Sequence, residues 1–463
     1  MKKTEVLLVN PVSEYRFDPF YVDIPLGILY LATVLEYEGI SVKIVDLQVE
    51  SIKKLIKIVK SEKPRIIGIS SLTPTFPSAL RIAKLCKSLL PETFIVMGGP
   101  HVTFRPYDAL KFPYVDVVVR GEGEVTFKEL SISILSKNSI NEKIYGISFK
   151  KENKIVNTPP RPLISNLDSL PYPRRELLPI KKYINLLEKV RRPVFQPVLV
   201  SRGCPYNCIF CVTPKMWGKI RYRSVENVIG ELKYIKDNFS FDAIKFVDDT
   251  LTFDKEYLLE LCKAIRASKL DIKWYCTGAR LDNINEEILR EMKASGCYKI
   301  YYGAESASDK ILKFIRKGFK ANIIEKVVKL TEKIGIEVAI GFIIGFPNET
   351  RRMALRTIEL AKKFKSSRIS FLTPYPGSEI FEKRRILGLR LVTRDWSKFT
   401  CNIPVAETKY LKIKDLCELY LMALEGALDF RHLEFLHMNR PIVREIIRRQ
   451  LKPGEEVHRE IVI

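Results

Sequence analysis

The sequence predicts an α/β protein with two parallel sheets: an N-terminal doubly wound sheet, then an open (β/α)6 barrel, with a helical region at the C-terminal end. Three observations predict it. Short apolar strands alternate with helical stretches over residues 1 to about 130, and again from residue 197. Small or polar residues follow most of these strands. A C-x3-C-x2-C motif follows the strand that opens the second series.

The first series predicts a doubly wound sheet over residues 1–150. We expect strands over 5–10, 42–46, 65–70, 94–98 and 116–121, with helices over 25–38, 52–61 and 77–89. Parallel sheets of this kind bind ligands beyond the carboxyl ends of their strands. Two of these ends carry hydroxyl groups and glycines, which let a bulky ligand approach the backbone closely. The residues are Ser70, Leu72 and Thr73 after one strand, and Gly98, Gly99 and His101 after the next.

The middle of the chain predicts a linker over residues 151–193. Its prolines interrupt any regular element: Pro159, Pro160, Pro162, Pro171, Pro173 and Pro179. We expect an extended connection without chemistry of its own.

The second series predicts the barrel, within residues 194–400. We expect six parallel strands over 198–201, 243–247, 273–277, 299–303, 337–345 and 368–372, separated by helices such as 283–295 and 323–334. Barrel enzymes carry catalytic groups just past the strand ends. The candidates there are Asp248, Asp249, Arg280, Glu305 and Ser306. Residues 401–463 lack this pattern and predict helices over 413–428 and 441–450.

The composition favours a cytoplasmic globular protein. The hydrophobic fraction of 46% is typical of a globular protein. The length of 463 residues suggests two or three domains. Six of the nine cysteines are scattered singly and predict no disulfide framework: Cys86, Cys262, Cys276, Cys297, Cys401 and Cys417. We expect neither a signal peptide nor a membrane-spanning helix, because the apolar runs are too short.

The net charge of +24, from 78 basic and 54 acidic side chains, predicts an anionic partner or simply a solvated basic surface. The excess includes the pairs Arg191-Arg192, Arg351-Arg352 and Arg384-Arg385, and the last helix with Arg440, Arg444, Arg448 and Arg449. We expect no nucleic acid, since no binding motif accompanies the charge. A basic amphipathic helix can rest on anionic lipid, so we expect peripheral membrane contact and a small-molecule or lipid substrate.

Cys204, Cys208 and Cys211 are the strongest functional signal. Three close thiolates can hold three irons of a [4Fe–4S] cluster, which leaves the fourth iron open to a small molecule. A structural zinc site or a chance spacing is the alternative, but no second Cys or His pair follows, as zinc sites usually require.

Together with the strand-end motifs, this spacing resembles the radical S-adenosylmethionine (SAM) enzymes that carry a cobalamin-binding domain. The resemblance implies that the three cysteines hold a [4Fe–4S] cluster and that SAM binds the open iron. It implies further contacts to SAM: Phe210 and the segment Gly341 to Gly345 near adenine, Asp248 and Asp249 near the amino group, Arg280 at the carboxylate, and Glu305 with Ser306 at the ribose or methionine part. The alternative for Asp248, Arg280 and Glu305 is a buried salt bridge at the barrel rim.

The N-terminal domain resembles the cobalamin-binding domain of the same family. The resemblance adds Glu122 to Ser70, Leu72, Thr73, Gly98, Gly99 and His101 as candidates around the cofactor. The usual Asp-x-His-x-x-Gly motif reads Asp23-Ile-Pro25-Leu-Gly27 here, and proline cannot bind cobalt. Cobalt then has no protein imidazole or takes another ligand, and we expect His101 to hydrogen-bond near the cofactor or the domain edge. The alternative is a similar sheet that has lost cobalamin.

The resemblance implies a cobalamin-dependent methyltransferase that cleaves SAM to a 5′-deoxyadenosyl radical and methylates an unactivated carbon through methylcobalamin. An external electron donor of the ferredoxin or flavodoxin type is implied with it. Two alternatives stay open: the same cofactors used for cyclisation, oxidation or carbon–carbon coupling, and a cofactor-binding sensor without turnover. The sequence does not identify the substrate.

Overall fold

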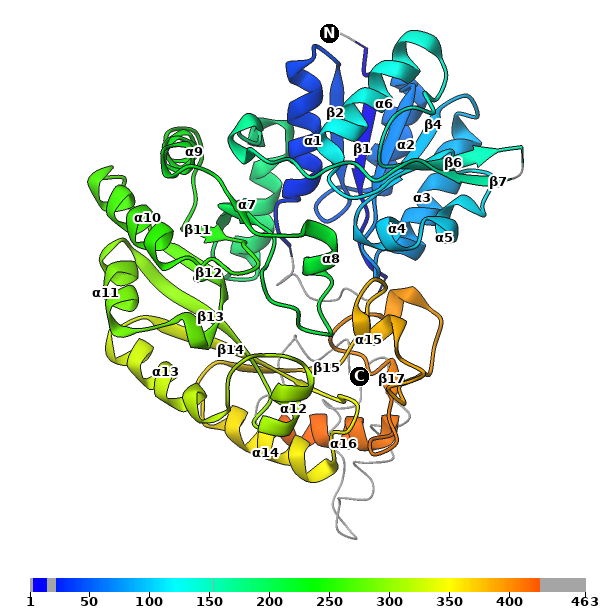
Figure 1. Cartoon of the computed structure of the whole chain (residues 1–463). Helices are drawn as coiled ribbons and strands as arrows, with labels where there is room; N and C mark the ends of the chain where they lie inside the picture. Colours follow the sequence, from blue (N-terminus) through cyan, green and yellow to red (C-terminus); the bar gives the residue numbers. More distant parts are fainter. Residues whose placement is uncertain (1–2, 15–21, 153, 425–463) are drawn as a thin grey trace.

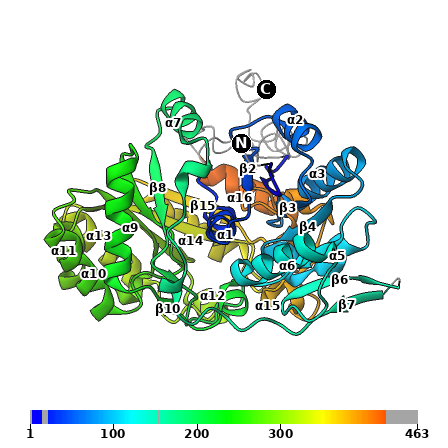
Figure 2. The ribbon, with the colours of Figure 1, turned by 90° about the horizontal axis from the view of Figure 1, so that it is seen from above.

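The computed structural model describes residues 3–14, 22–152 and 154–424. Two sheets lie side by side, the N-terminal one in blue and cyan and the second in green and yellow (Figure 1). The view from above shows helix α1 (Leu26–Tyr37) on the side of the N-terminal sheet that faces the second sheet (Figure 2). The C-terminal part, drawn in orange, completes the molecule below the N-terminal sheet.

The N-terminal sheet has the order β2-β1-β3-β4-β5-β6-β7, in which β1 to β5 are parallel and β6 and β7 add antiparallel strands at one edge. Its strands leave apolar side chains on both faces, and each face forms a separate core. Helices α1 and α6 cover one core, and α2, α3, α4 and α5 cover the other. The strands are β1 (Val6–Asn10), β2 (Val42–Asp46), β3 (Ile66–Ser70), β4 (Phe94–Gly98), β5 (Val117–Val119), β6 (Ile147–Lys151) and β7 (Lys154–Asn157). The helices are α2 (Ile52–Glu62), α3 (Phe76–Leu89), α4 (Pro100–Phe104), α5 (Pro106–Leu110) and α6 (Gly123–Lys137).

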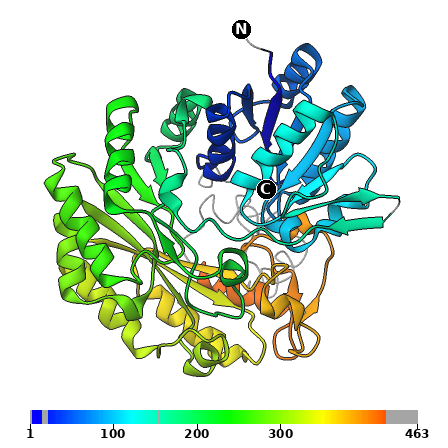
Figure 3. The ribbon, with the colours of Figure 1, turned by 45° about the horizontal axis from the view of Figure 1, so that its top comes forward.

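The second sheet has the order β15-β14-β13-β12-β11-β8, so that neighbouring strands follow one another along the chain. All are parallel, and helices line the outer face (Figure 3). The strands are β8 (Phe195–Val198), β11 (Ala243–Phe246), β12 (Trp274–Ala279), β13 (Cys297–Glu305), β14 (Glu337–Ile344) and β15 (Ser367–Phe371). The helices are α9 (Val225–Asn238), α10 (Lys255–Ala267), α11 (Glu286–Ala294), α13 (Asn322–Lys333) and α14 (Arg351–Lys362). The predicted pair of sheets, with the second one open, is confirmed.

Several shorter elements were not predicted. Helix α7 (Ile180–Lys189) begins directly after Pro179, where a proline is compatible with a helix start. The cluster loop follows the short strand β9 (Ser201–Arg202), which pairs with β10 (Arg221–Tyr222). A further hairpin joins β16 (Arg390–Leu391) to β17 (Ala406–Glu407).

The C-terminal region contributes α16 (Ile413–Ala423), which packs against α14 and β15. The helix predicted over 441–450, with its arginines, lies outside the described residues. Within the ranges that the structure describes, no helix combines the length and apolar character that crossing a bilayer requires.

Candidate active site

The three motif cysteines lie on the loop between β9 and helix α8 (Thr213–Trp217). Burial is the main cause that raises the pKa of the Cys204 thiol to about 11, and the charges of Cys211, Asp249 and Cys208 contribute to the same increase. In the described chain, no three His, Cys, Asp or Glu side chains converge as they would on one metal ion. A [4Fe–4S] cluster does not require such convergence, since each thiolate binds a different iron. The donor set therefore fits a cluster.

Backbone contacts fix the shape of this loop. The carbonyl of Ile209 accepts a hydrogen bond from Ile380 N–H at 2.9 Å, and the N–H of Ile209 donates to the Ile315 carbonyl at 3.3 Å. Gly203 has φ +102°, and a Cβ there would lie 2.7 Å from the Lys219 carbonyl oxygen, so glycine is required. Segments distant in sequence thus hold the cluster loop from both sides.

Asp248, at the end of β11, supports the strand that leads to the cluster loop. Its Oδ1 accepts the Val200 N–H at 3.1 Å, the Ser201 N–H, and the Ser201 hydroxyl at 2.7 Å. Burial raises its pKa to about 7, although these hydrogen bonds act in the opposite direction. Asp248 is therefore a buried anchor for β9.

Asp249, the next residue, lines the cavity between the two sheets. The Thr213 hydroxyl donates to its Oδ1 at 2.9 Å, and burial raises its pKa. Asp249 faces an open space, so it remains the better placed of the two aspartates to accept a hydrogen bond from a ligand.

Arg280 stacks on the cluster loop. Its guanidinium carbon lies 3.5 Å from the ring centre of Tyr206, which stands between Cys204 and Cys208. Nε and Nη2 donate to the two carboxylate oxygens of Asp282 at 3.0 and 2.8 Å. Arg280 therefore forms a salt bridge at the barrel rim, which the sequence analysis gave as the alternative to a contact with SAM. A contact from Arg280 to SAM stays a proposal.

Glu305 and Lys317 form a buried ion pair beside the cysteines, with Nζ 2.8 Å from Oε1. The Lys317 ammonium lowers the pKa values of the Cys208 and Cys211 thiols, although burial raises them more strongly. Sequence reasoning missed Lys317, because it belongs to no strand end or motif and reaches the site from the turn after α12 (Asp309–Phe314). Like Arg280, Glu305 forms a salt bridge at the barrel rim, the alternative to a contact with SAM.

Ser306, Gly341 and Gly345 face protein in this structure. Ser306 is fully buried, with its hydroxyl 3.3 Å from that of Thr357. A Cβ on Gly341 would lie 2.0 Å from the Tyr301 hydroxyl, and one on Gly345 would lie 3.3 Å from Leu416 of α16. The Phe210 ring lies 5.9 Å from that of Phe346. Their contact with SAM remains a proposal.

A cavity of about 470 Å³ lies between the carboxyl ends of the two sheets. Of the residues predicted around cobalamin, it brings together Ser70, Leu72, Gly98, Gly99 and Glu122. The barrel half of the chain contributes Ser201 and Arg202 of β9, Trp217 of α8, and Asp249 from the loop after β11. A Cβ added to Gly27 or Gly121 in its wall would meet nothing within 4 Å, so backbone is open to a ligand there. This volume lies within the range of cofactor sites.

Two separate parts of the chain match two family models. Residues 21–131 match the B12 binding domain, and residues 198–361 match the radical SAM superfamily. A protein of Pyrococcus horikoshii, named as an uncharacterized methyltransferase, is 40% identical over 428 residues, which cover 90% of this chain and 91% of that protein. The chain belongs to the cobalamin-dependent radical SAM methyltransferase family.

More distant relatives extend the likeness. The cytidylyl-2-hydroxyethylphosphonate methyltransferase of Streptomyces wedmorensis is 29% identical over 82% of this chain and 81% of its own length. The structure of the methyltransferase TsrM from Kitasatospora setae, with cobalamin and a [4Fe–4S] cluster bound, matches with a TM-score of 0.72 at 18% identity. That match covers 97% of this chain and 100% of TsrM, and it shows that the fold is shared.

The cofactors of this methyltransferase are a [4Fe–4S] cluster, SAM and cobalamin. The cysteines fit the cluster, and the cavity with its open glycine backbone fits cobalamin. No histidine lines the cavity within the described residues, so the wall offers no imidazole to cobalt. Pro25, which stands where the usual motif has histidine, itself lines the cavity.

His101 and Thr73 lie away from the cavity wall of the methyltransferase. His101 is 1% exposed, stacks on Phe76 with ring centres 4.1 Å apart, and meets Trp396 edge-on at 5.1 Å. Its Nδ1 lies 3.3 Å from the Thr73 hydroxyl, and burial lowers its pKa. His101 thus joins the N-terminal domain to the segment that follows the barrel.

Glu122 connects the two domains. Its carboxylate binds Arg202 and Arg221, each at 3.0 Å, and accepts the Ile164 N–H at 2.7 Å. Arg202 also binds Glu124 at 2.6 Å. Arg202 lies two residues before Cys204, so these ion pairs link the cobalamin cavity directly to the cluster loop. Sequence reasoning did not assign Arg202 a role.

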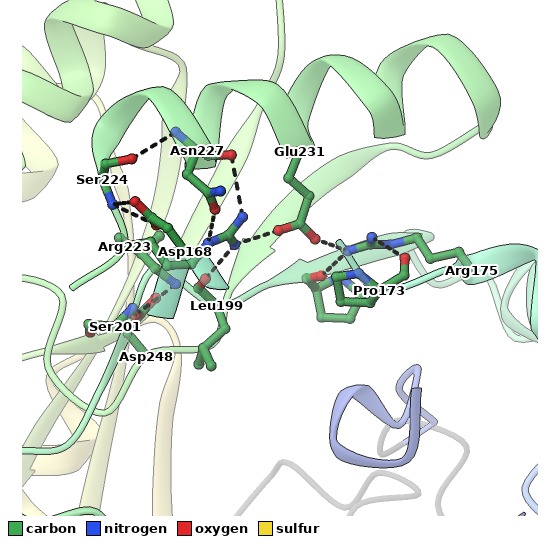
Figure 4. Close-up of polar contacts among 12 residues, drawn as sticks. Asp168, Pro173, Arg175, Leu199, Ser201, Arg223, Ser224, Asn227, Glu231 and Asp248 are labelled. Atoms are coloured by element: carbon green, nitrogen blue, oxygen red, sulfur yellow. Dashed lines mark hydrogen bonds and ion pairs between the residues drawn. The ribbon is translucent and has the colours of Figure 1, made fainter. Parts of the chain in front are cut away.

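The linker is anchored to the barrel by a buried cluster of charges (Figure 4). Glu231 of α9 binds Arg175 of the linker at 2.8 Å and also binds Arg223. Arg175 donates to the Pro197 carbonyl at 2.7 Å, and Arg223 donates to the Leu199 carbonyl at 2.8 Å. Both carbonyls lie on the segment that leads to the cluster loop.

Proposed function

We propose that this methyltransferase transfers a methyl group from SAM to an unactivated carbon of a small molecule held between its two domains. The observation that carries the proposal is the cavity, whose wall is formed by the strand ends of both sheets. When bound, the cluster and SAM supply a radical that abstracts hydrogen, and cobalamin supplies the methyl carrier. A substrate between the sheets would meet both reagents, and such orientation is a large part of catalysis.

The chain's own residues hold and orient these reagents. Cys204, Cys208 and Cys211 hold the cluster. Asp249, kept in place by the Thr213 hydroxyl, accepts a hydrogen bond from the SAM ammonium group. The buried pair of Lys317 and Glu305 sets the charge beside the cluster.

An external one-electron donor of the ferredoxin or flavodoxin type completes the proposed reaction. The relatives differ in the substrates that their names state: a cytidylyl phosphonate in Streptomyces wedmorensis and a hopanoid in Methylococcus capsulatus. We propose a small molecule as substrate. A lipid taken from a membrane surface is the more specific proposal, which the charge of the sequence motivates.

The test uses anaerobically reconstituted protein, a one-electron reductant, SAM labelled in its methyl group, and a small-molecule extract of the cells that make the protein. We expect 5′-deoxyadenosine, S-adenosylhomocysteine and a labelled product. Asp249→Asn should weaken SAM binding, whereas Asp254→Asn, at the N-cap of α10, should not. Formation of 5′-deoxyadenosine with an unlabelled product would indicate cyclisation or oxidation instead. Absence of both SAM-derived products would indicate a sensor without turnover.

A further inference from the structure

A second concave surface, of about 490 Å³, lies on the segment between α15 (Glu379–Glu382) and the short helix η5 (Trp396–Lys398). It contains the pair Arg384-Arg385, to which the proposed reaction assigns no role. Four of its seven lining residues are arginines and none is acidic. The lining residues are Arg384, Arg385, Gly388, Leu389, Arg390, Leu391 and Arg394, and we call this surface the arginine pocket.

Two of the four guanidinium groups are held in place by the fold. Arg384 Nη1 donates to the Phe381 carbonyl at 2.7 Å, and its guanidinium lies 4.5 Å from the centre of the Phe381 ring. Arg390 binds Glu407 across the β16–β17 hairpin, with Nε and Nη2 at 3.0 and 2.6 Å from Oε1. Because these side chains are already ordered, a ligand need not pay their full ordering entropy.

The other two guanidinium groups are available. Arg385 and Arg394 are exposed, and in the described ranges neither guanidinium group has an ion pair or hydrogen bond with another residue. Among these four arginines, Arg390 alone forms an ion pair with a described carboxylate, that of Glu407. Four like charges around one hollow repel one another, and an anion in the hollow would relieve this repulsion. The planar fork of arginine matches the oxygens of a phosphoryl group.

We propose that the arginine pocket binds a phosphoryl group. It shares no lining residue with the cofactor cavity, so this is a separate site. Its apolar residues Leu389 and Leu391 pack into the same cluster as Phe210, between the cysteines Cys208 and Cys211. The segment that carries the pocket therefore shares a core with the cluster loop, and α15, which precedes this segment, donates the Ile380 N–H to the Ile209 carbonyl of that loop. The inference does not rest on the proposed methyl transfer.

The phosphoryl group belongs to a soluble phosphorylated compound or to a lipid headgroup. Ile386, between the arginines, is 87% exposed and could enter a membrane surface. The first arm of the experiment is equilibrium dialysis of the reconstituted full chain against labelled inorganic pyrophosphate. We expect one saturable site per chain. Arg385→Ala with Arg394→Ala should weaken binding about tenfold or more, because each removes charge-assisted hydrogen bonds.

The matched control is Arg352→Ala with Arg356→Ala, two exposed arginines of α14 that remove the same charge away from the pocket. Binding should be retained in this control. Equal weakening in both double variants would show an effect of net charge alone and would overturn the proposal, as would the absence of saturable binding in both arms.

The second arm is sedimentation with phosphatidylglycerol or phosphatidylcholine vesicles at physiological salt. Sedimentation with the anionic vesicles that is lost in Arg385→Ala with Arg394→Ala identifies a lipid headgroup as the source. Pyrophosphate binding without sedimentation identifies a soluble compound. Both double variants should keep their iron content and 5′-deoxyadenosine formation, so failure of the pocket and failure of the proposed reaction are distinguishable.

Discussion

At the scale of single residues, we predict that the three thiols on the cluster loop decide whether the enzyme holds its [4Fe–4S] cluster. Replacing Cys208 by Ala removes one of three thiolate ligands, so we expect the reconstituted variant to lose its [4Fe–4S] cluster. Iron and sulfide content, with the electron paramagnetic resonance signal of the reduced protein, measures this. Cys262→Ala is the control, since Cys262 is buried in α10 away from the loop, and it should keep a full cluster. A full cluster in Cys208→Ala would contradict the ligand assignment.

Lys317 leads to a subtler prediction. Its buried ammonium stands beside Cys208 and Cys211, and reduction of the cluster adds negative charge there. Lys317→Met should therefore make the midpoint potential of the cluster more negative, because an attractive charge in a poorly solvated place is lost. Redox titration followed by electron paramagnetic resonance measures the shift. Lys320→Met removes an exposed charge that solvent screens, and should change the potential less. An unchanged potential in Lys317→Met would contradict this electrostatic role.

At the level of residues, the sequence supports a prediction where the spacing of side chains suffices, and it does not where the direction of a side chain decides. The cysteine spacing predicts the cluster ligands, and this assignment stays a prediction. Asp248 and Asp249 were indistinguishable in the sequence, yet one anchors β9 and the other lines the cavity. Lys317 carried no signal, because only the folded turn after α12 brings it to the cysteines.

At the scale of elements, the turn between β14 and α14 depends on one carboxyl group. Glu349 is fully buried and accepts the N–H groups of Gly345, at 2.6 Å, and Phe346, at 3.2 Å. Next to it, Asn348 has φ +64°, a left-handed conformation that asparagine tolerates better than most residues. Asn348 thus lets the chain turn sharply just before Glu349.

The same carboxyl group predicts a pH dependence of stability. Burial raises the pKa of Glu349 from 4.5 to about 7, so between these values the folded chain keeps a proton that the unfolded chain releases. The free energy of unfolding therefore falls as pH rises through this window, by about 3 kcal/mol from this group. Glu349→Gln cannot ionise, so its melting temperature relative to wild type should rise between about pH 5 and about pH 8.

The control for this measurement is Glu325→Gln. Glu325 is paired with Lys363 on the surface, and this hydrogen bond lowers its pKa. Its pairing stabilises the folded state fully above the ordinary glutamate pKa of 4.5 and is lost only at more acid pH, so the melting temperature of Glu325→Gln relative to wild type should stay nearly constant between about pH 5 and about pH 8. Parallel behaviour of the two variants would contradict the assignment to Glu349.

The elements themselves were predictable to different degrees. Parallel strands such as β3 and β14 are buried on both faces, so each appears in the sequence as a continuous apolar run. Helix α7 was missed because the prolines before it suggested an extended segment. The β16–β17 hairpin was missed because each strand has two residues, too few for any alternation to appear.

At the scale of the whole molecule, Arg202 holds the two domains around the cofactor cavity. Removing it by Arg202→Met would leave Glu122 and Glu124 buried with less compensation, at a cost of roughly 3–5 kcal/mol. We expect this variant to retain less cobalamin after gel filtration and to be cleaved faster in the linker by a protease. The surface pair of Lys128 and Glu38 supplies the control, and Lys128→Met should behave like wild type. Normal cobalamin content in Arg202→Met would show that the domains dock independently of this contact.

The hydrogen bond from Arg175 to the Pro197 carbonyl also affects whether a second chain can pair with the edge of the sheet. β8 is an edge strand, and an open sheet edge invites strands of a second chain to pair with it. Val198 directs its carbonyl toward β11, so the backbone of Pro197 points outward. Proline offers no N–H there, and Arg175 already occupies its carbonyl. The linker thus closes the edge of β8 at Pro197 to a strand of a second chain, a role that an extended connection without chemistry would not suggest.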